Sequence, residues 1–126
     1  MRVLLIGVGG FVGSVLRYGL SGLTQDLAPR SVFPVGTLAV NILGCLAIGV
    51  LSELADARGF LSPDIRALLI VGLLGGFTTF SAFANETVNA IRGGSFVLAL
   101  ANVLLSVGAC LLAVSVGRAL AHSIWR

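Results

Sequence analysis

Nine residues near the middle of this chain combine glycines, hydroxyl side chains and phenylalanines inside an otherwise apolar segment. Residues 75–83 read Gly-Gly-Phe-Thr-Thr-Phe-Ser-Ala-Phe and follow the apolar run of residues 67–74. A bilayer core offers no water for hydrogen bonding, so three hydroxyls at that depth are costly unless they have a function. Glycines followed by β-branched residues weaken a helix, and backbone carbonyls released by a break can bind a cation. Phe80 and Phe83 share one helix face, and the whole pattern indicates an ion pathway.

The composition of the chain is typical of a membrane protein. Of its 126 residues, 57% are hydrophobic and 10% are charged, and the mean hydropathy is +1.08. Soluble domains carry about 25% charged residues. Because each span needs about 20 residues, the length allows one domain of four spans. The eight basic residues are scattered arginines, which indicates loop and interface anchors and no nucleic-acid partner.

We predict a single all-α membrane domain over residues 1–126, with the third of its four transmembrane helices broken mid-membrane. The predicted spans cover residues 3–23, 35–54, 65–91 and 96–121. Turn-forming residues mark the connections between them: Pro29, Pro34, Asp56 to Gly59, and Gly93-Gly94. Ser62 should cap the third span, with Pro63 at its first position.

The arginines give a weak signal for orientation in the membrane. Four spans put both termini on one side, and the arginines divide five to three between the sides: Arg2, Arg58, Arg66, Arg118 and Arg126 against Arg17, Arg30 and Arg92. An excess of positive charge marks the cytoplasmic side, so this small bias favours insertion both ways round and an antiparallel homodimer. Ordinary one-way insertion is the alternative.

Two four-residue glycine spacings suit close helix approach: Gly9 with Gly13, and Gly72 with Gly76.

Polar residues in the other spans have two interpretations each. The Asn41 amide could hold helices together, or its N–H donors could replace water around an anion. In the fourth span, residues spaced by four form a polar-to-small stripe that suits either packing or a permeation track with Ser106 opposite Asn41. The stripe consists of Asn102, Ser106, Cys110 and Val114.

The roles of two charged residues also remain open. Arg17 could extend to the lipid headgroups or form a positive vestibule that concentrates anions. Glu86 could be solvated near the interface or belong to a polar track.

Cys45 and Cys110 suit helix packing better than a disulfide, and no metal-ligand spacing surrounds them.

No residue pattern indicates an enzyme. The single histidine, His122, lies near the C-terminus, and no serine, cysteine or carboxylate pair has a base at a fixed offset.

Three fragments in order resemble the Fluc/CrcB fluoride channels of bacteria. They are Gly9-Gly10-Phe-Val-Gly13-Ser-Val-Leu-Arg17-Tyr18, Pro34-Val-Gly36-Thr37-Leu-Ala-Val-Asn41-Ile-Leu-Gly44, and residues 75–83. The resemblance covers nearly the whole chain. The family commonly has threonine at Ala82, so one hydroxyl of the track is missing here. Cys110 and Val114 stand where relatives can have serine and threonine.

The resemblance implies an antiparallel, dual-topology homodimer with two pores in a bacterial cell membrane, surrounded by lipid. It implies passive export of fluoride, which lowers the cytoplasmic concentration. Phe80 and Phe83 are expected to line the anion path, with donors or hydroxyls from Asn41, Thr79, Ser81 and Ser106. The carbonyls of Gly75 and Thr78 from both subunits are expected to hold one structural, untransported Na⁺.

The alternative function is a small dual-topology, proton-coupled multidrug exporter. Such an exporter needs a carboxylate embedded in the membrane. The first span has no acid, and Glu86 is the only candidate.

Overall fold

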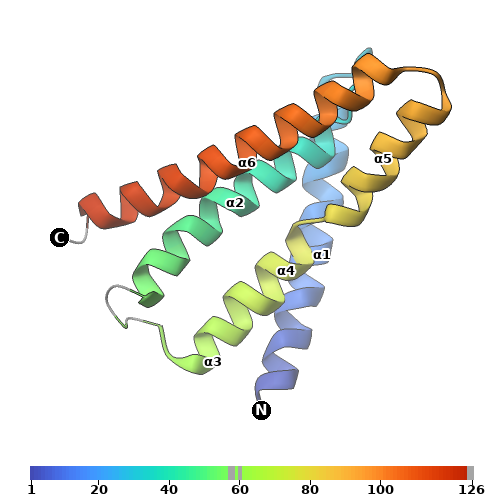
Figure 1. The fold of residues 1–126 in the computed structure, drawn as a ribbon. Helices are drawn as coiled ribbons and strands as arrows, with labels where there is room; N and C mark the ends of the chain where they lie inside the picture. Colours follow the sequence, from blue (N-terminus) through green and yellow to red (C-terminus); the bar gives the residue numbers. More distant parts are fainter. Residues whose placement is uncertain (57–58, 60, 125–126) are drawn as a thin grey trace.

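The described part of the chain is entirely helical. The computed structural model describes residues 1–56, 59 and 61–124, and no strand occurs among them. The elements in order are α1 (Arg2–Leu27), α2 (Val35–Asp56), α3 (Pro63–Arg66), the π-helical segment η1 (Ala67–Leu74), α4 (Gly75–Phe77), α5 (Phe80–Arg92) and α6 (Phe96–Ile124). Figure 1 shows them as long rods joined by short connections.

Four segments are long and apolar enough to cross a membrane. They are Arg2–Leu27, Val35–Asp56, Pro63–Arg92 and Phe96–Ile124. The all-α class and the four spans predicted from the sequence are therefore confirmed. The helices extend past the predicted ends, because polar residues beyond an apolar stretch can continue the same helix and its backbone hydrogen bonds. In α1, for example, the Thr24 hydroxyl donates to the Leu20 carbonyl at 2.8 Å.

Helices α2 and α6 run side by side in the same direction (Figure 1). Glycines let their backbones approach closely. A Cβ at Gly49 would collide with the Val114 carbonyl oxygen, and one at Gly117 would collide with the Leu46 carbonyl oxygen. Further along, Arg118 forms an ion pair with Glu53 at 3.6 Å. Matching residues of the two helices therefore stay opposite one another through successive turns.

The predicted glycine spacings pack α1 against the third span within one chain. Cβ atoms at Gly9 and Gly13 would meet the backbone of η1, and one at Gly76 would meet the backbone of Gly10. A Cβ added at Gly72 would lie 2.8 Å from the Ile6 carbonyl oxygen. These contacts fix the stretch that leads into residues 75–83.

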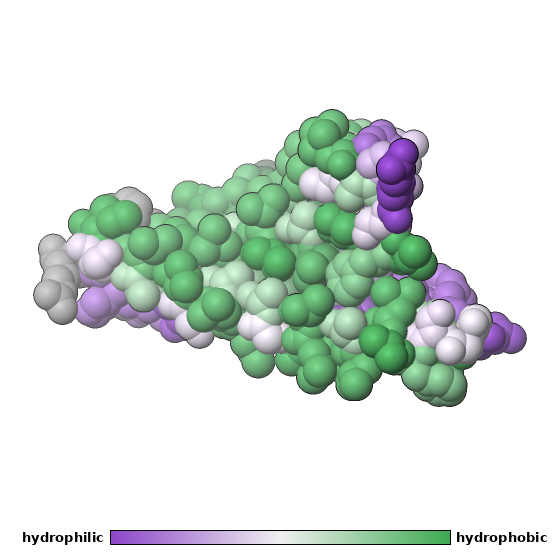
Figure 2. Space-filling model, turned by 90° about the horizontal axis from the view of Figure 1, so that it is seen from above, coloured by the Kyte–Doolittle hydropathy of each residue, from purple (hydrophilic) through white to green (hydrophobic). Residues whose placement is uncertain are grey.

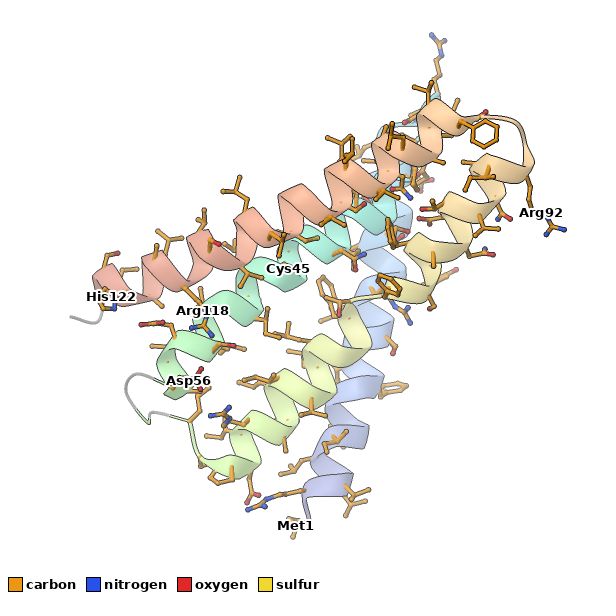
Figure 3. The ribbon with its side chains drawn as sticks, viewed as in Figure 1. Met1, Cys45, Asp56, Arg92, Arg118 and His122 are labelled. Atoms are coloured by element: carbon orange, nitrogen blue, oxygen red, sulfur yellow. The ribbon has the colours of Figure 1, made fainter. Side chains whose placement is uncertain are left out.

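The face of the molecule seen in Figure 2 is mostly hydrophobic, with hydrophilic residues toward its edges. One end of the molecule, where α1 begins and α2 and α6 end, carries Met1, Asp56, Arg118 and His122, and Arg92 lies at the other end (Figure 3). Ion pairs crowd the first end: Arg2 with Asp64 at 2.8 Å, Arg66 with Asp56 at 3.5 Å, and Arg118 with Glu53 and Asp56, both at 3.6 Å. Arg58 and Arg126, which enter the predicted charge count, lie outside the described residues.

The predicted helix start and the turn at Gly93-Gly94 are found where expected, whereas the predicted turn from Asp56 to Gly59 lies partly outside the described residues. The Ser62 hydroxyl accepts a hydrogen bond from the Ile65 N–H at 3.3 Å, and Pro63 is the first residue of α3. Gly94 turns the chain between α5 and α6 with a φ of 79°, a conformation that favours glycine.

Candidate functional site

The helical course of the third span is interrupted at two threonines. Helix α4 ends at Phe77 and α5 begins at Phe80. Between them Thr78 has a ψ of 156°, and Thr79 is extended with φ −148° and ψ 110°. Thr79 then acts as the N-cap of α5, because its hydroxyl accepts the Ala82 N–H at 3.2 Å.

The side chain of Asn41 on α2 holds this interruption in place. Its Oδ1 accepts the Thr79 N–H at 2.8 Å, and its Nδ2 donates to the Thr79 carbonyl at 3.1 Å. A single amide thus satisfies both backbone groups of one non-helical residue. Asn41 does hold two segments together, which was one of its two predicted roles.

The interruption changes the partners of two carbonyls. In an uninterrupted α-helix the Thr79 N–H would donate to the Gly75 carbonyl, and the Ala82 N–H would donate to that of Thr78. Both donors are instead taken, by Asn41 and by the Thr79 hydroxyl. Gly75 and Thr78 therefore present carbonyl oxygens that have lost their helical donors. Oxygens of this kind suit a hard cation such as Na⁺.

No carboxylate or imidazole cluster competes with this arrangement. Among residues 1–56, 59 and 61–124, no three His, Cys, Asp or Glu side chains are placed to hold a metal ion. A cation at this site would be held by neutral oxygens, and the two carbonyls fit that requirement.

A cavity of about 350 Å³ lies beside the interruption, between α2, the third span and α6. It brings together most of the residues predicted to form the site: Asn41, Gly75, Thr78, Thr79, Phe80, Phe83 and Ser106. The Phe80 and Phe83 rings lie 5.4 Å apart with a tilt of 51°. Phe80 is 78% exposed, so one side of the aromatic pair is not covered by its own chain.

Ser106 joins a second polar series that sequence reasoning found only in part. Its hydroxyl donates to Asn102 Oδ1 at 3.2 Å, Asn102 Nδ2 donates to the Thr87 hydroxyl at 2.9 Å, and Thr87 donates to the Phe83 carbonyl at 2.8 Å. Ser106 and Asn102 are buried. One part of the stripe on α6 packs against α2, since the Val114 backbone lies against Gly49, while Ser106 lines the cavity, and its role in a permeation track stays a prediction. Thr87 was missed, although its position four residues after Phe83 was a usable signal.

A second cavity, of about 840 Å³, holds the residues whose roles were open. Arg17, Asp26 and Glu86 all line it, so the arginine is accompanied by two acids. The Thr37 hydroxyl donates to Glu86 Oε1, and Glu86 Oε2 is buried with no hydrogen-bond partner among the described residues. Thr79 lines both cavities and so lies between them.

Ser81 is the one predicted pathway residue outside both linings. It is exposed on α5, and its hydroxyl lies 3.2 Å from that of Thr79. Ala82 lines the second cavity.

Comparison with known proteins gives concordant matches. Residues 4–118 match the family described as CrcB-like protein, Camphor Resistance (CrcB). A protein of Methylobacillus flagellatus named fluoride-specific ion channel FluC is 48% identical over 106 residues, covering 84% of this chain and 83% of the relative. Proteins of the same name occur in Ruminiclostridium cellulolyticum, at 45% identity over 98% of this chain and 95% of the relative, and in Shewanella halifaxensis, at 44% over 97% of each.

Proposed function

This chain belongs to the CrcB-like family, and on that premise we propose that it is a fluoride channel that exports the ion passively and lowers its cytoplasmic concentration. It is a multi-pass protein of a bacterial cell membrane, with four spanning helices. The observation that carries the proposal is the cavity beside Thr78 and Thr79. There an aromatic pair, an amide and a hydroxyl meet at an interruption of the third span.

The aromatic pair and the polar groups offer an anion complementary contacts. A phenyl ring has a positive edge, so Phe80 and Phe83 can contact fluoride edge-on. Asn41 Nδ2 carries two hydrogens and gives one to Thr79, which leaves the other for an ion. The Ser106 hydroxyl can rotate from Asn102 toward the cavity. These groups together replace part of the hydration shell of a small anion.

A structural Na⁺ belongs to the same proposal. The carbonyls of Gly75 and Thr78 would hold it, since both have lost their helical donors and both residues line the cavity. Its positive charge would favour an anion in the pathway, because attraction strengthens in a low-dielectric site. The ion is held and not transported.

An antiparallel homodimer would complete the site. Gly75 and Phe80 are exposed in the single chain, although both belong to the cavity lining. A second copy related by two-fold symmetry would cover them and double the two carbonyls to four. The nearly balanced arginines favour the two orientations that such a dimer needs, and lipid would surround the remaining apolar surface.

Fluoride efflux from liposomes that contain only this purified protein tests the proposal. Vesicles loaded with fluoride should release it to an external electrode without a proton gradient. Vesicles loaded with chloride serve as the selectivity control. Phe80→Ile should abolish most of the release, whereas Leu100→Ile, on the exposed face of α6, should leave it intact. Absence of fluoride release from correctly folded protein would refute the function.

A further inference from the structure

Two thiols face the same cavity from neighbouring helices. Cys45 on α2 and Cys110 on α6 are the only cysteines of the chain. Both are free, half-buried and part of the lining of the 350 Å³ cavity. Figure 3 labels Cys45 on its helix, in the region where α2 runs beside α6.

The packing of α2 on α6 places the two cysteines at the same level of the cavity wall. Gly49 lies against the Val114 backbone, and one turn further along Glu53 pairs with Arg118. Counting back one turn on both helices from Gly49 and Val114 reaches Cys45 and Cys110. The pair is therefore held by a close parallel contact of two long helices.

The chemistry of the pair matches a soft cation. Thiolates prefer soft metals such as Cu⁺, and ions of this class bind two sulfurs in a linear arrangement. No third His, Cys, Asp or Glu side chain joins the two thiols among the described residues, which disfavours a four-coordinate zinc site. We propose that Cys45 and Cys110 form a two-coordinate site for a soft monovalent cation of the Cu⁺ class, and that its occupation closes the cavity to anions.

The binding step balances without a redox partner. Each thiol releases its proton to water and forms one sulfur–metal bond. Two thiolates and one monovalent cation leave a complex with a single negative charge. That charge lies in the wall shared with Asn41, Phe83 and Ser106. It repels an anion strongly where the dielectric constant is low, and the metal itself narrows the space.

The binding half of the proposal is independent of fluoride conduction. Purified full-length protein in chloride-free nitrate buffer is titrated with Ag⁺, a redox-stable probe of the same class. We expect equimolar Ag⁺ per chain after gel filtration, a sulfur-to-metal absorption band, and release of two protons for each ion bound. Cys45→Ala and Cys110→Ala should each lose the equimolar binding. Ser115→Ala should keep it, since the exposed Ser115 hydroxyl bonds only the Leu111 carbonyl of its own helix. Equimolar binding that survives in both cysteine variants, or no binding by the unaltered protein, overturns the site.

The closure half rests on the proposed function and is read from flux. Each variant's fluoride efflux with Ag⁺ is divided by its own efflux without Ag⁺. Equimolar Ag⁺ should stop efflux through the unaltered protein and the Ser115→Ala variant, and should leave the Cys45→Ala/Cys110→Ala double variant at its own starting rate. Ag⁺ that binds while efflux continues overturns closure but not the site. Lack of efflux before Ag⁺ is added contradicts the channel function, while the absorption and proton measurements still judge the site.

Discussion

The Asn41 amide grips Thr79 by both backbone groups, accepting its N–H at 2.8 Å and donating to its carbonyl at 3.1 Å. Asn41 and Thr79 are far apart in sequence, and their contact replaces hydrogen bonds that Thr79 would make within a continuous helix. Because Asn41 takes the Thr79 N–H, the Gly75 carbonyl loses its helical donor, and the Thr78 carbonyl loses its donor because the Thr79 hydroxyl accepts the Ala82 N–H. A single side chain on α2 thus links the lining of the cavity to the proposed cation site.

Replacing Asn41 should therefore lower the stability of the chain as well as affect the cavity. Asn41→Ala leaves the buried Thr79 N–H without an acceptor, which costs about 1–3 kcal/mol, and removes the amide donor to the Thr79 carbonyl. Asn41→Asp keeps the acceptor but loses the donor. We expect the thermal midpoint in detergent to fall in the order Asn, Asp, Ala. Equal stability of all three proteins would show that the contact does not hold the interruption.

The aromatic pair can be tested with substitutions that keep its bulk. Phe80→Ile or Phe83→Ile preserves apolarity but removes the positive ring edge. Fluoride flux should fall by about tenfold or more, equivalent to ~1.4 kcal/mol in the barrier, while the elution volume in size-exclusion chromatography stays unchanged. Unaltered flux in both single variants would assign the pair to packing.

Topology can be read from reporters at the C-terminus. Because the arginine bias is small, we expect labelled populations on both sides of the membrane. Arginines added at the loop of Gly93 and Gly94 should shift insertion to one orientation and reduce fluoride efflux. Reporter activity on a single side of the membrane for the unaltered chain would contradict the antiparallel dimer.

The sequence was informative where local chemistry decides the structure. Ser62 with Pro63 predicted a helix start correctly, because a cap depends on neighbours along the chain. The separation of α4 from α5 at Thr78 and Thr79 falls within residues 75–83, while a break in the middle of the membrane stays a prediction. Which atoms Asn41 uses could not be predicted, since this depends on how α2 packs against the third span. The acceptor of the Ser106 hydroxyl, Asn102 on the same helix, could not be predicted either. Nor could the position of Cys45 and Cys110 on the wall of one cavity.

Two adjacent glycines should respond differently to the same substitution. Gly75 is helical, with φ −62° and ψ −37°, and an added Cβ would lie 4.0 Å from the Ile70 carbonyl oxygen, an ordinary van der Waals distance. At Gly76 an added Cβ would strike the Gly10 backbone. Gly76→Ala should therefore lower the thermal stability of the chain. Gly75→Ala should leave that stability nearly unchanged but weaken the dimer and fluoride flux, because the methyl group would project into the proposed interface with a second copy. Unaltered dimerisation and flux in Gly75→Ala would contradict an interface at this glycine.

Removal of Na⁺ tests the proposed cation site. The Gly75 and Thr78 ligands are backbone oxygens, so Thr78→Ser should have little effect on Na⁺ dependence. Protein dialysed exhaustively into a large organic cation should lose fluoride efflux and regain it when Na⁺ returns, since the positive charge favours the anion only while bound. Efflux measured with Na⁺ on one side, both sides or neither side separates a structural ion from a transported one: a structural ion requires no Na⁺ gradient. Full efflux after depletion verified by atomic emission would refute the structural cation and leave the channel assignment to Phe80, Phe83 and Asn41.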